Sequence, residues 1–192
     1  MPKPDPAALA YLSRRRSYPA KSMVPPAPGE DEVMGLLALA TRVPYHGKLE
    51  PWRFVLIDKP AMARLADLAE ARARATGGDE ERIAKGRGQY DTGIYAVAVI
   101  AVPRPSEKVP EIEQLLSAGA VCLGLVNAAE AAGWAANWLS GWPAHDPVWA
   151  AEALGLVPGE KVAGIIHIAS EGAPVPDRPR PDLSRLVTKA RP

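Results

Sequence analysis

Two apolar runs restrict the fold of this 192-residue chain more than any other feature. They read IYAVAVIAV at residues 94–102 and KVAGIIHIA at residues 161–169. Both runs are short, rich in β-branched residues and without a polar face, which is typical of strands that are buried on both sides. We therefore expect a central sheet with helices packed against each of its faces.

Helical patterns surround these two strands. The expected helices span residues 5–17, 31–42, 60–75, 111–132 and 146–155, and further strands are expected at residues 52–58 and 133–139. Asp146 and Pro147 form a start signal for the last helix, and Gly155 marks its end. The polar, glycine-containing segment 79–93 is interpreted as a connection between a helix and a strand. The pattern predicts an α/β or α+β fold in three layers.

The length of the chain and its apolar content of 47% fit a single domain over residues 1–192 with a full hydrophobic core. Residues 172–192 are expected to form an extended arm without a core of its own, because prolines recur between Pro174 and Pro192. Such an arm lies either in solvent or along another subunit.

The charge balance narrows the range of partners. The formal net charge is +1, so no basic field favours nucleic acid or an anionic membrane. Cys122 is the only cysteine, which excludes an internal disulfide and fits a reducing compartment. No apolar segment of signal-peptide length precedes the N-terminal arginines, so we expect a cytoplasmic protein. The apolar run 115–142 contains Asn127 and Glu130, which favours a buried helix over a membrane span.

Two short motifs suggest ligand binding. In SRRRSY (13–18), guanidinium groups beside a serine hydroxyl suit a phosphate group, and a solvated helix end is the alternative. In NWLSGW (137–142), two indoles flank a Ser-Gly turn. Such a pair could line a flat pocket for a planar heterocycle, or simply form a corner of the core.

The histidines and the cysteine indicate no catalytic or metal site. The three histidines lack the spacing of metal ligands, so no metal is expected. His46 is interpreted as a loop residue, His145 as a turn residue and His167 as a hydrogen-bonded histidine of the core. Cys122 lies in an apolar helix, where a thiol is inert, and no motif of a nucleotide loop, nucleophile elbow or zinc protease occurs. A redox cofactor that brings its own reactive atoms would account for this absence.

Four segments, taken in order, carry a likeness to a known family. They are RRS (15–17), RVPYHGKLEPWRFVLI (42–57), KVPEIEQLLSAGAVCLGL (108–125) and GWAANWLSGW (133–142). Together they resemble the FMN-dependent nitroreductase family, and in particular its small, single-domain branch. The resemblance implies an α+β fold, a three-layer α/β/α sandwich with a central, mainly antiparallel sheet, in an intertwined homodimer with FMN at the dimer interface.

The resemblance also implies an activity. Members of the family pass a hydride from NADH or NADPH through flavin N5 to a nitroaromatic, a quinone or a similar small-molecule acceptor by a ping-pong route, so no protein residue is expected to be catalytic by itself. Two alternatives stay open for this chain: a flavin-binding or flavin-sequestering protein without turnover, and an enzyme whose substrate is reduced flavin.

Residue by residue, the resemblance implies a set of cofactor contacts. The expected FMN contacts are Arg15, Arg16 and Ser17 near the phosphate and ribityl chain, Arg42 and His46 in a loop that reaches the flavin from the partner subunit, Lys48 near flavin N1, Trp138, Leu139 and Ser140 in a second stretch, and Arg180 in the tail. Ala128 matches a contact of the nicotinamide dinucleotide.

The chain departs from the family pattern at several of these positions. Where the family commonly has N-x-Q-P-W, this chain has Lys48 and Glu50, so a cation replaces an amide at the flavin edge. Pro19 stands where a basic residue is frequent, and Leu139 where the small branch can carry arginine, which leaves more of the phosphate binding to Arg15.

The long apolar helix fits the expected dimer. Its small residues, Gly119, Ala120, Gly124, Ala128 and Ala131, are expected to admit a helix of a second subunit at close range.

Overall fold

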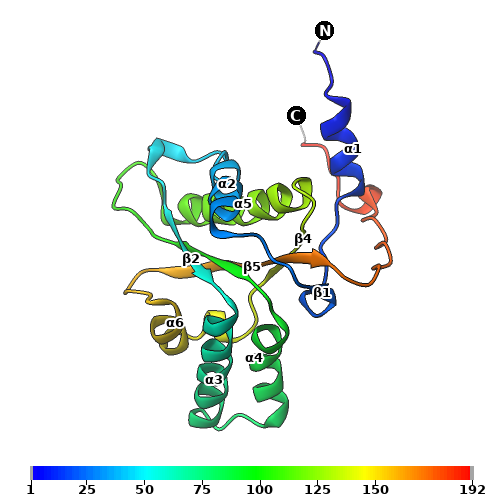
Figure 1. Ribbon diagram of the computed structural model, residues 1–192. Coiled ribbons are helices and arrows are strands. Elements are labelled where there is room, and N and C mark those ends of the chain that lie inside the picture. Colours follow the sequence, from blue (N-terminus) through cyan, green and yellow to red (C-terminus); the bar gives the residue numbers. More distant parts are fainter. Residues whose placement is uncertain (1, 191–192) are drawn as a thin grey trace.

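The computed structural model describes residues 2–190, in which six α-helices surround one five-stranded sheet (Figure 1). The strands are β1 (Met23–Val24), β2 (Trp52–Ile57), β3 (Ala96–Ala101), β4 (Ala135–Leu139) and β5 (Lys161–Glu171). Every pairing among them is antiparallel: β2 pairs with β3, and β5 pairs with β3, β4 and β1. The predicted antiparallel sheet is confirmed.

The two apolar runs are the central strands, as predicted. All six residues of β3 are buried, and so are Gly164–Ala169 in β5. The helices α2 (Glu30–Ala40) and α5 (Glu111–Ala131) cover one face of the sheet, and α3 (Lys59–Ala75), α4 (Glu80–Thr92) and α6 (Pro147–Leu154) cover the other (Figure 1). The three-layer prediction is therefore confirmed.

Helix α4 was not expected, because segment 79–93 was interpreted as a connection. Asp79 caps the helix by accepting a hydrogen bond from the backbone N–H of Arg82 at 2.8 Å. Gly86 and Gly88 lower the helix propensity of this segment, but tertiary contacts outweigh that preference. The helix packs antiparallel to α3, and the packing replaces the missing apolar periodicity (Figure 1).

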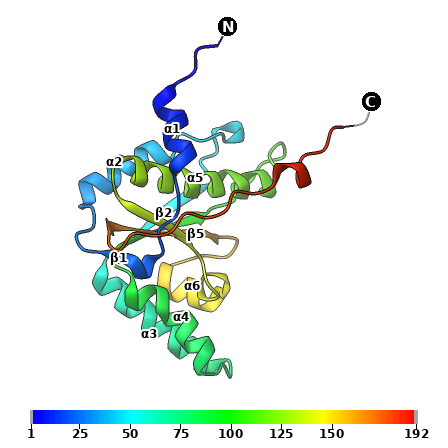
Figure 2. The ribbon, with the colours of Figure 1, turned by 90° about the vertical axis from the view of Figure 1, so that its right-hand side faces the viewer.

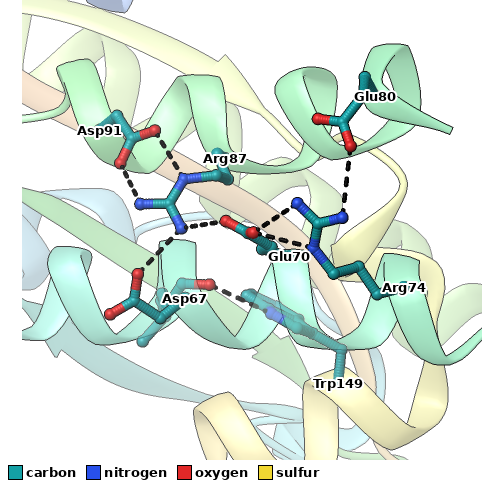
Figure 3. Close-up of polar contacts among 8 residues, drawn as sticks. Asp67, Glu70, Arg74, Glu80, Arg87, Asp91 and Trp149 are labelled. Atoms are coloured by element: carbon teal, nitrogen blue, oxygen red, sulfur yellow. Dashed lines mark hydrogen bonds and ion pairs between the residues drawn. The ribbon is translucent and has the colours of Figure 1, made fainter. Parts of the chain in front are cut away.

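Arg87 of α4 holds this helix pair together (Figure 3). Its guanidinium lies 2.9 Å from both Asp67 and Glu70 of α3, and 3.1 Å from Asp91 on its own helix. These carboxylates raise the pKa of Arg87, with the hydrogen bond that Arg87 donates to Asp67 as the largest cause. A charge network thus substitutes for part of the apolar seam that a helix pair usually has.

Helix α1 (Pro6–Arg14) is shorter than the expected helix 5–17. Arg15 already has extended backbone angles, φ −55° and ψ 143°, so residues 15–17 lie beyond the last helical turn. The chain leaves the helix because Tyr18 joins β4: its N–H donates to Ala136 O at 2.9 Å, and its carbonyl accepts from Asn137 Nδ2 at 2.7 Å.

Helix α1 and the C-terminal segment both project from the core, and Figure 2 shows that they leave it in different directions (Figures 1 and 2). No residue of α1 is buried, and Leu9 and Leu12 are 58% and 56% exposed. After β5, residues 173–190 contain one 3-10 turn, Leu183–Arg185, and none of them is buried. Arg180 Nη2 donates to Ser13 O at 2.9 Å and so ties this segment to α1.

Helix α5 runs across the sheet and is half buried. Within residues 2–190 it is the one helix that is long and apolar enough to cross a membrane. Its buried side packs in the core cluster, which favours a core helix. Gly124 serves contacts inside the chain: a Cβ there would stand 2.6 Å from Ala40 O of α2. The expectation that Gly124 admits a second subunit is therefore wrong, because α2 already occupies that space.

Candidate functional site

The arginine motif lines a cavity of about 210 Å³ between α1, the start of β4 and the end of β5. Arg14, Arg15 and Arg16 all border it, together with Tyr18 and Glu171. The site thus combines several cations with the backbone of an edge strand, in a volume that suits one phosphate group. The structure brings the predicted phosphate-binding arginines together around one cavity.

Arg15 lies next to a buried acid of α5, Glu130. Its Nε lies 3.6 Å from Glu130 Oε2, and the Glu130 side chain is only 6% exposed. The Tyr11 hydroxyl lies 3.3 Å from the same oxygen and donates to Asn127 O at 3.0 Å. Burial raises the pKa of Glu130, and the charge of Arg15 acts in the opposite direction. Burial and the charge of Glu130 raise the pKa of Tyr11 to about 12.

Arg16 and Arg180 are used differently from Arg15. Arg16 Nε donates to Ser17 O at 3.3 Å, its Nη1 donates to Pro176 O, and its guanidinium lies 5.8 Å from the centre of the Tyr18 ring. Arg180 bonds Ser13 O rather than lining the cavity. Both side chains therefore fasten the C-terminal segment to α1, and Arg16 does so at the rim of the cavity.

A second and larger cavity, about 690 Å³, lies at the other end of β4. It is lined mainly by apolar side chains, among them Trp138 of β4, Leu115 of α5 and Ala150 of α6, with Lys161 and His145 as polar members. The Trp138 indole is 39% exposed and borders this space. The prediction of an aromatic wall is confirmed for Trp138, whereas Trp142 packs elsewhere.

The unexpected helix α4 holds the turn that follows Trp138. Gln89 Nε2 donates to Ser140 O at 3.1 Å, and a Cβ at Gly141 would stand 2.7 Å from the same nitrogen. Trp142 Nε1 donates to Arg82 O at 3.0 Å. Ser140, a predicted cofactor contact, is thus positioned by a helix that the sequence pattern did not reveal.

The two cavities both border strand β4, one at each end. Ala135 borders the arginine cavity and Trp138 the apolar cavity, and three residues of extended chain span about 10 Å. A ligand that carries an anionic group at one end and a planar, apolar ring system at the other matches this arrangement. Leu139 is the last residue of β4 and Ser140 follows it, and neither is among the residues that line the apolar cavity.

The remaining predicted contacts lie far from Arg15 in the same chain. His46 Nδ1 is 3.0 Å from Glu113 Oε2, near the start of α5, while Glu130 and Arg15 lie at its end. Seventeen residues separate the two glutamates, which corresponds to about 25 Å along a helix. One protomer therefore cannot bring His46 and Arg15 to the same small ligand. Arg42 directly follows α2 and is exposed.

The loop that carries His46 has an unusual backbone. Lys48 and Glu50 have φ values of 54° and 46°, which are costly for residues other than glycine. These are the two positions at which the chain departs from the N-x-Q-P-W pattern of the family. Strained residues of this kind cluster at ligand sites, and the Lys48 side chain is exposed and forms no hydrogen bond or ion pair with the described residues.

Three further expectations concern buried residues, Ala128, Cys122 and His167. Ala128 lies in the core cluster with 8% of its surface exposed, so its contact with a dinucleotide stays a prediction. Cys122 is fully buried, and burial raises its pKa to about 12, as expected for an inert thiol. His167 is buried, but neither ring nitrogen has a hydrogen-bond partner among the described residues, so the expected hydrogen bond is wrong.

Sequence reasoning missed Glu130, Tyr11 and Gln89 as parts of the site. The available signal for Glu130 was weak: an acid in an otherwise apolar helix, which also suits a surface position. Gln89 lay in a segment interpreted as irregular. Their roles depend on contacts between residues that are 51 to 119 positions apart.

Comparison with known proteins adds independent information. The model of the nitroreductase family matches residues 12–170. The Escherichia coli (strain K12) protein named "Putative NAD(P)H nitroreductase YdjA" is 32% identical over 176 residues, which cover 88% of this chain and 94% of that protein.

Solved structures share the fold. A nitroreductase-like family protein from Bacillus cereus has a TM-score of 0.78 at 21% identity, with 99% of this chain and 98% of that chain covered. A Desulfovibrio desulfuricans structure, described as a putative nitroreductase in complex with FMN, has a TM-score of 0.74 at 19% identity, with 98% and 99% covered. The predicted nitroreductase-like fold is confirmed.

Proposed function

Because this chain belongs to the nitroreductase family, we propose that it is an FMN-dependent oxidoreductase that takes a hydride from NADH or NADPH and passes it to a small organic acceptor. Nitroaromatics and quinones are the acceptor classes that we expect. The name of the Escherichia coli relative, an NAD(P)H nitroreductase, supports a nicotinamide reductant. The Desulfovibrio desulfuricans structure, which is described as an FMN complex, supports FMN as the cofactor.

The observation that carries the proposal is the pair of cavities at the two ends of β4. The residues present fit FMN: Arg15 and Arg16 border the arginine cavity and offer guanidinium donors to its phosphate, and Arg15 Nη1 has no hydrogen-bond acceptor within residues 2–190. The Ser17 hydroxyl lies beside them, 3.5 Å from Arg15 Nη2. The apolar cavity beside Trp138 suits the ring system. FMN, when bound, supplies the ring nitrogen that accepts and returns the hydride.

The protein's own groups would bind and orient the cofactor. The arginines fix the phosphate end, and the turn at Ser140, fastened to α4, offers backbone groups beside the ring. The apolar cavity is bordered by the cation Lys161 and also by the carboxylate of Glu160, which is paired with Arg53. No side chain is needed as a nucleophile, in agreement with the buried and inert Cys122.

The active form in this proposal is a homodimer. Arg15 and His46 lie at opposite ends of α5, so two protomers whose α5 helices pack antiparallel would bring the His46 loop of each to the arginine cavity of the other. Leu116 and Leu123, two helical turns apart on α5, are 66% and 47% exposed and offer an apolar seam for that contact. Leu9 and Leu12 of α1 add further uncovered apolar surface.

The visible absorption spectrum of the purified protein tests the cofactor and the turnover together. We expect flavin bands after purification or after addition of FMN, and rapid bleaching when NADPH or NADH is added under nitrogen. A protein that binds FMN but does not bleach would be a flavin-sequestering protein. Loss of flavin itself during turnover would identify reduced flavin as the substrate, and a protein that never binds FMN would exclude all three.

Arg15→Met supplies a matched variant for the same measurement. It should bind FMN at least tenfold more weakly, because hydrogen bonds to charged groups contribute about 1.5–3 kcal/mol. Arg178→Met is the control, because the Arg178 side chain is exposed and forms no ion pair within residues 2–190.

A further inference from the structure

The acid beneath Arg15 has no part in the function proposed above. Glu130 is almost completely buried at the end of α5 and borders the arginine cavity; its partners are Tyr11 of α1 and Arg15, the residue that follows α1. We propose that Glu130, together with Tyr11, is a positioning residue that aims the Arg15 guanidinium at the phosphate of the flavin and thereby makes the site select phosphorylated over unphosphorylated flavin. This inference rests on the proposed function and assigns a role within the same site.

The geometry of Arg15 supports this role. A guanidinium is a planar fork, so contacts on one edge fix the direction of the others. The Nε edge of Arg15 faces Glu130 at 3.6 Å, and its Nη2 lies 3.5 Å from Ser17 Oγ. Nη1 has no hydrogen bond to any described residue, while Arg15 borders the cavity. Glu130 therefore turns the free edge of the fork toward the place of the phosphate.

Unpartnered buried atoms show that the arrangement is incomplete without a ligand. Arg15 Nε and Glu130 Oε1 are both buried and have no hydrogen-bond partner within residues 2–190. Buried polar atoms are nearly always hydrogen-bonded, so each such atom calls for an explanation. A phosphate that engages the outer edge of Arg15 would draw the guanidinium into one fixed orientation against the carboxylate, whose 3.6 Å distance is longer than a charge-assisted hydrogen bond.

Tyr11 holds the carboxylate in turn. Its hydroxyl lies 3.0 Å from Asn127 O and 3.3 Å from Glu130 Oε2, so it links the first helix to the end of α5. The charged groups around Glu130 are Arg14, Arg15 and Arg16 from the N-terminal segment, with Glu171 from β5 across the cavity. Glu171 borders the same cavity and has no ion pair with Arg15 among the described residues.

Glu171 therefore offers a matched control that separates positioning from charge. Removing either carboxylate takes one negative charge away from the phosphate site. If charge alone mattered, Glu130→Ala and Glu171→Ala would both bind FMN more tightly than the wild type. A positioning role predicts that only Glu130→Ala binds FMN more weakly.

The experiment is a fluorescence titration of the full-length protein with FMN and with riboflavin, which lacks the phosphate. We expect Glu130→Ala to lose about tenfold in FMN affinity and less than threefold in riboflavin affinity. Glu130→Gln, which keeps an acceptor oxygen for Arg15 and Tyr11, should restore FMN binding to within about threefold of the wild type. Tyr11→Phe, a small change on an exposed helix, should lower the ratio of FMN to riboflavin affinity by about fivefold, because the one hydroxyl proton of Tyr11 is shared between Glu130 Oε2 and Asn127 O.

The outcomes separate the two proposals. If the wild type binds neither flavin, the proposed function is wrong. If the wild type prefers FMN but Glu130→Ala and Tyr11→Phe keep that preference unchanged, the positioning role is wrong and the proposed function stands. Equal losses of FMN and riboflavin affinity would also overturn the role, because they would show general damage to the fold. Should Glu130→Ala fail to fold, Tyr11→Phe and Glu130→Gln decide the matter.

Discussion

The indole ring of Trp138 in β4 lies directly over Gly164 in β5. A Cβ at Gly164 would overlap the ring, with Trp138 Cδ1 only 2.7 Å away. On its other side the ring approaches α5, where a Cβ at Gly119 would stand 3.8 Å from Cη2. The absence of a side chain at Gly164 therefore gives the indole its place at the wall of the apolar cavity.

Gly164→Ala should displace Trp138. Because the indole is partly exposed, the ring can move into the cavity and the fold should survive, with a loss of about 1–3 kcal/mol in the free energy of unfolding. We expect a changed near-ultraviolet circular dichroism spectrum and weaker FMN binding. Gly119→Ala is the control for the circular dichroism change, since 3.8 Å is an ordinary van der Waals contact; a similar spectral change in both variants would contradict this account.

Arg53→Met should make the free energy of unfolding depend less on pH in the acid range. Arg53 binds Glu160 through two hydrogen bonds of 2.8 and 2.6 Å, and this contact lowers the pKa of Glu160. A lowered carboxyl pKa stabilises the folded state above the unfolded value and loses this effect as the pH falls through the folded value.

The variant should thus be less stable than the wild type at pH 7, by about 1–2 kcal/mol after allowance for the partial exposure of Arg53. The difference should shrink below pH 4. Urea unfolding at pH 7 and pH 3 measures it, and a difference that persists unchanged at pH 3 would rule out the ion pair as its cause.

His167→Leu should remove a second cause of the loss of stability at acid pH. Burial lowers the pKa of His167 to about 4, and the ring has no hydrogen-bond partner within residues 2–190. In the unfolded chain the imidazole takes up a proton near pH 6.5, so the wild type loses stability as the pH falls from 6.5 to 4, by about 3 kcal/mol.

The leucine variant should lack this part of the loss. At pH 7 its stability should equal or exceed that of the wild type, because an unpartnered polar ring is replaced by an apolar side chain. Urea unfolding between pH 7 and pH 4 provides the comparison with the wild type. An unchanged pH profile would mean that His167 is solvated in the folded protein.

Leu123→Glu should dissociate the proposed dimer. A carboxylate in the middle of the α5 seam would lose its water on association without gaining a partner. Light scattering after gel filtration should give the monomer mass, and FMN affinity should fall because the His46 loop of the second subunit is lost. Val148→Glu, at a residue of α6 that is 50% exposed, is the control and should leave the mass unchanged.

The sequence by itself determined the layers of this fold. The runs around β3 and β5 have no polar face, so only a sheet covered on both sides can bury them. Local signals set the helix ends as well: Asp146 accepts hydrogen bonds from Val148 N and Trp149 N at 3.0 Å, and Gly155 adopts the left-handed conformation, φ 65°. The arginine motif and Trp138 could likewise be identified as candidate binding residues from the sequence, because the groups that make them candidates lie close together along the chain.

The tertiary structure alone decided how these candidates combine. It formed α4 from a segment with little apolar periodicity, placed Glu130 beneath Arg15, and separated His46 from Arg15 by most of the length of α5. The physical reason is the distance along the chain over which each interaction acts. Periodicity and capping act over a few residues and can be read along the chain, whereas an ion pair or a buried hydrogen bond depends on which distant segments the packed core brings together.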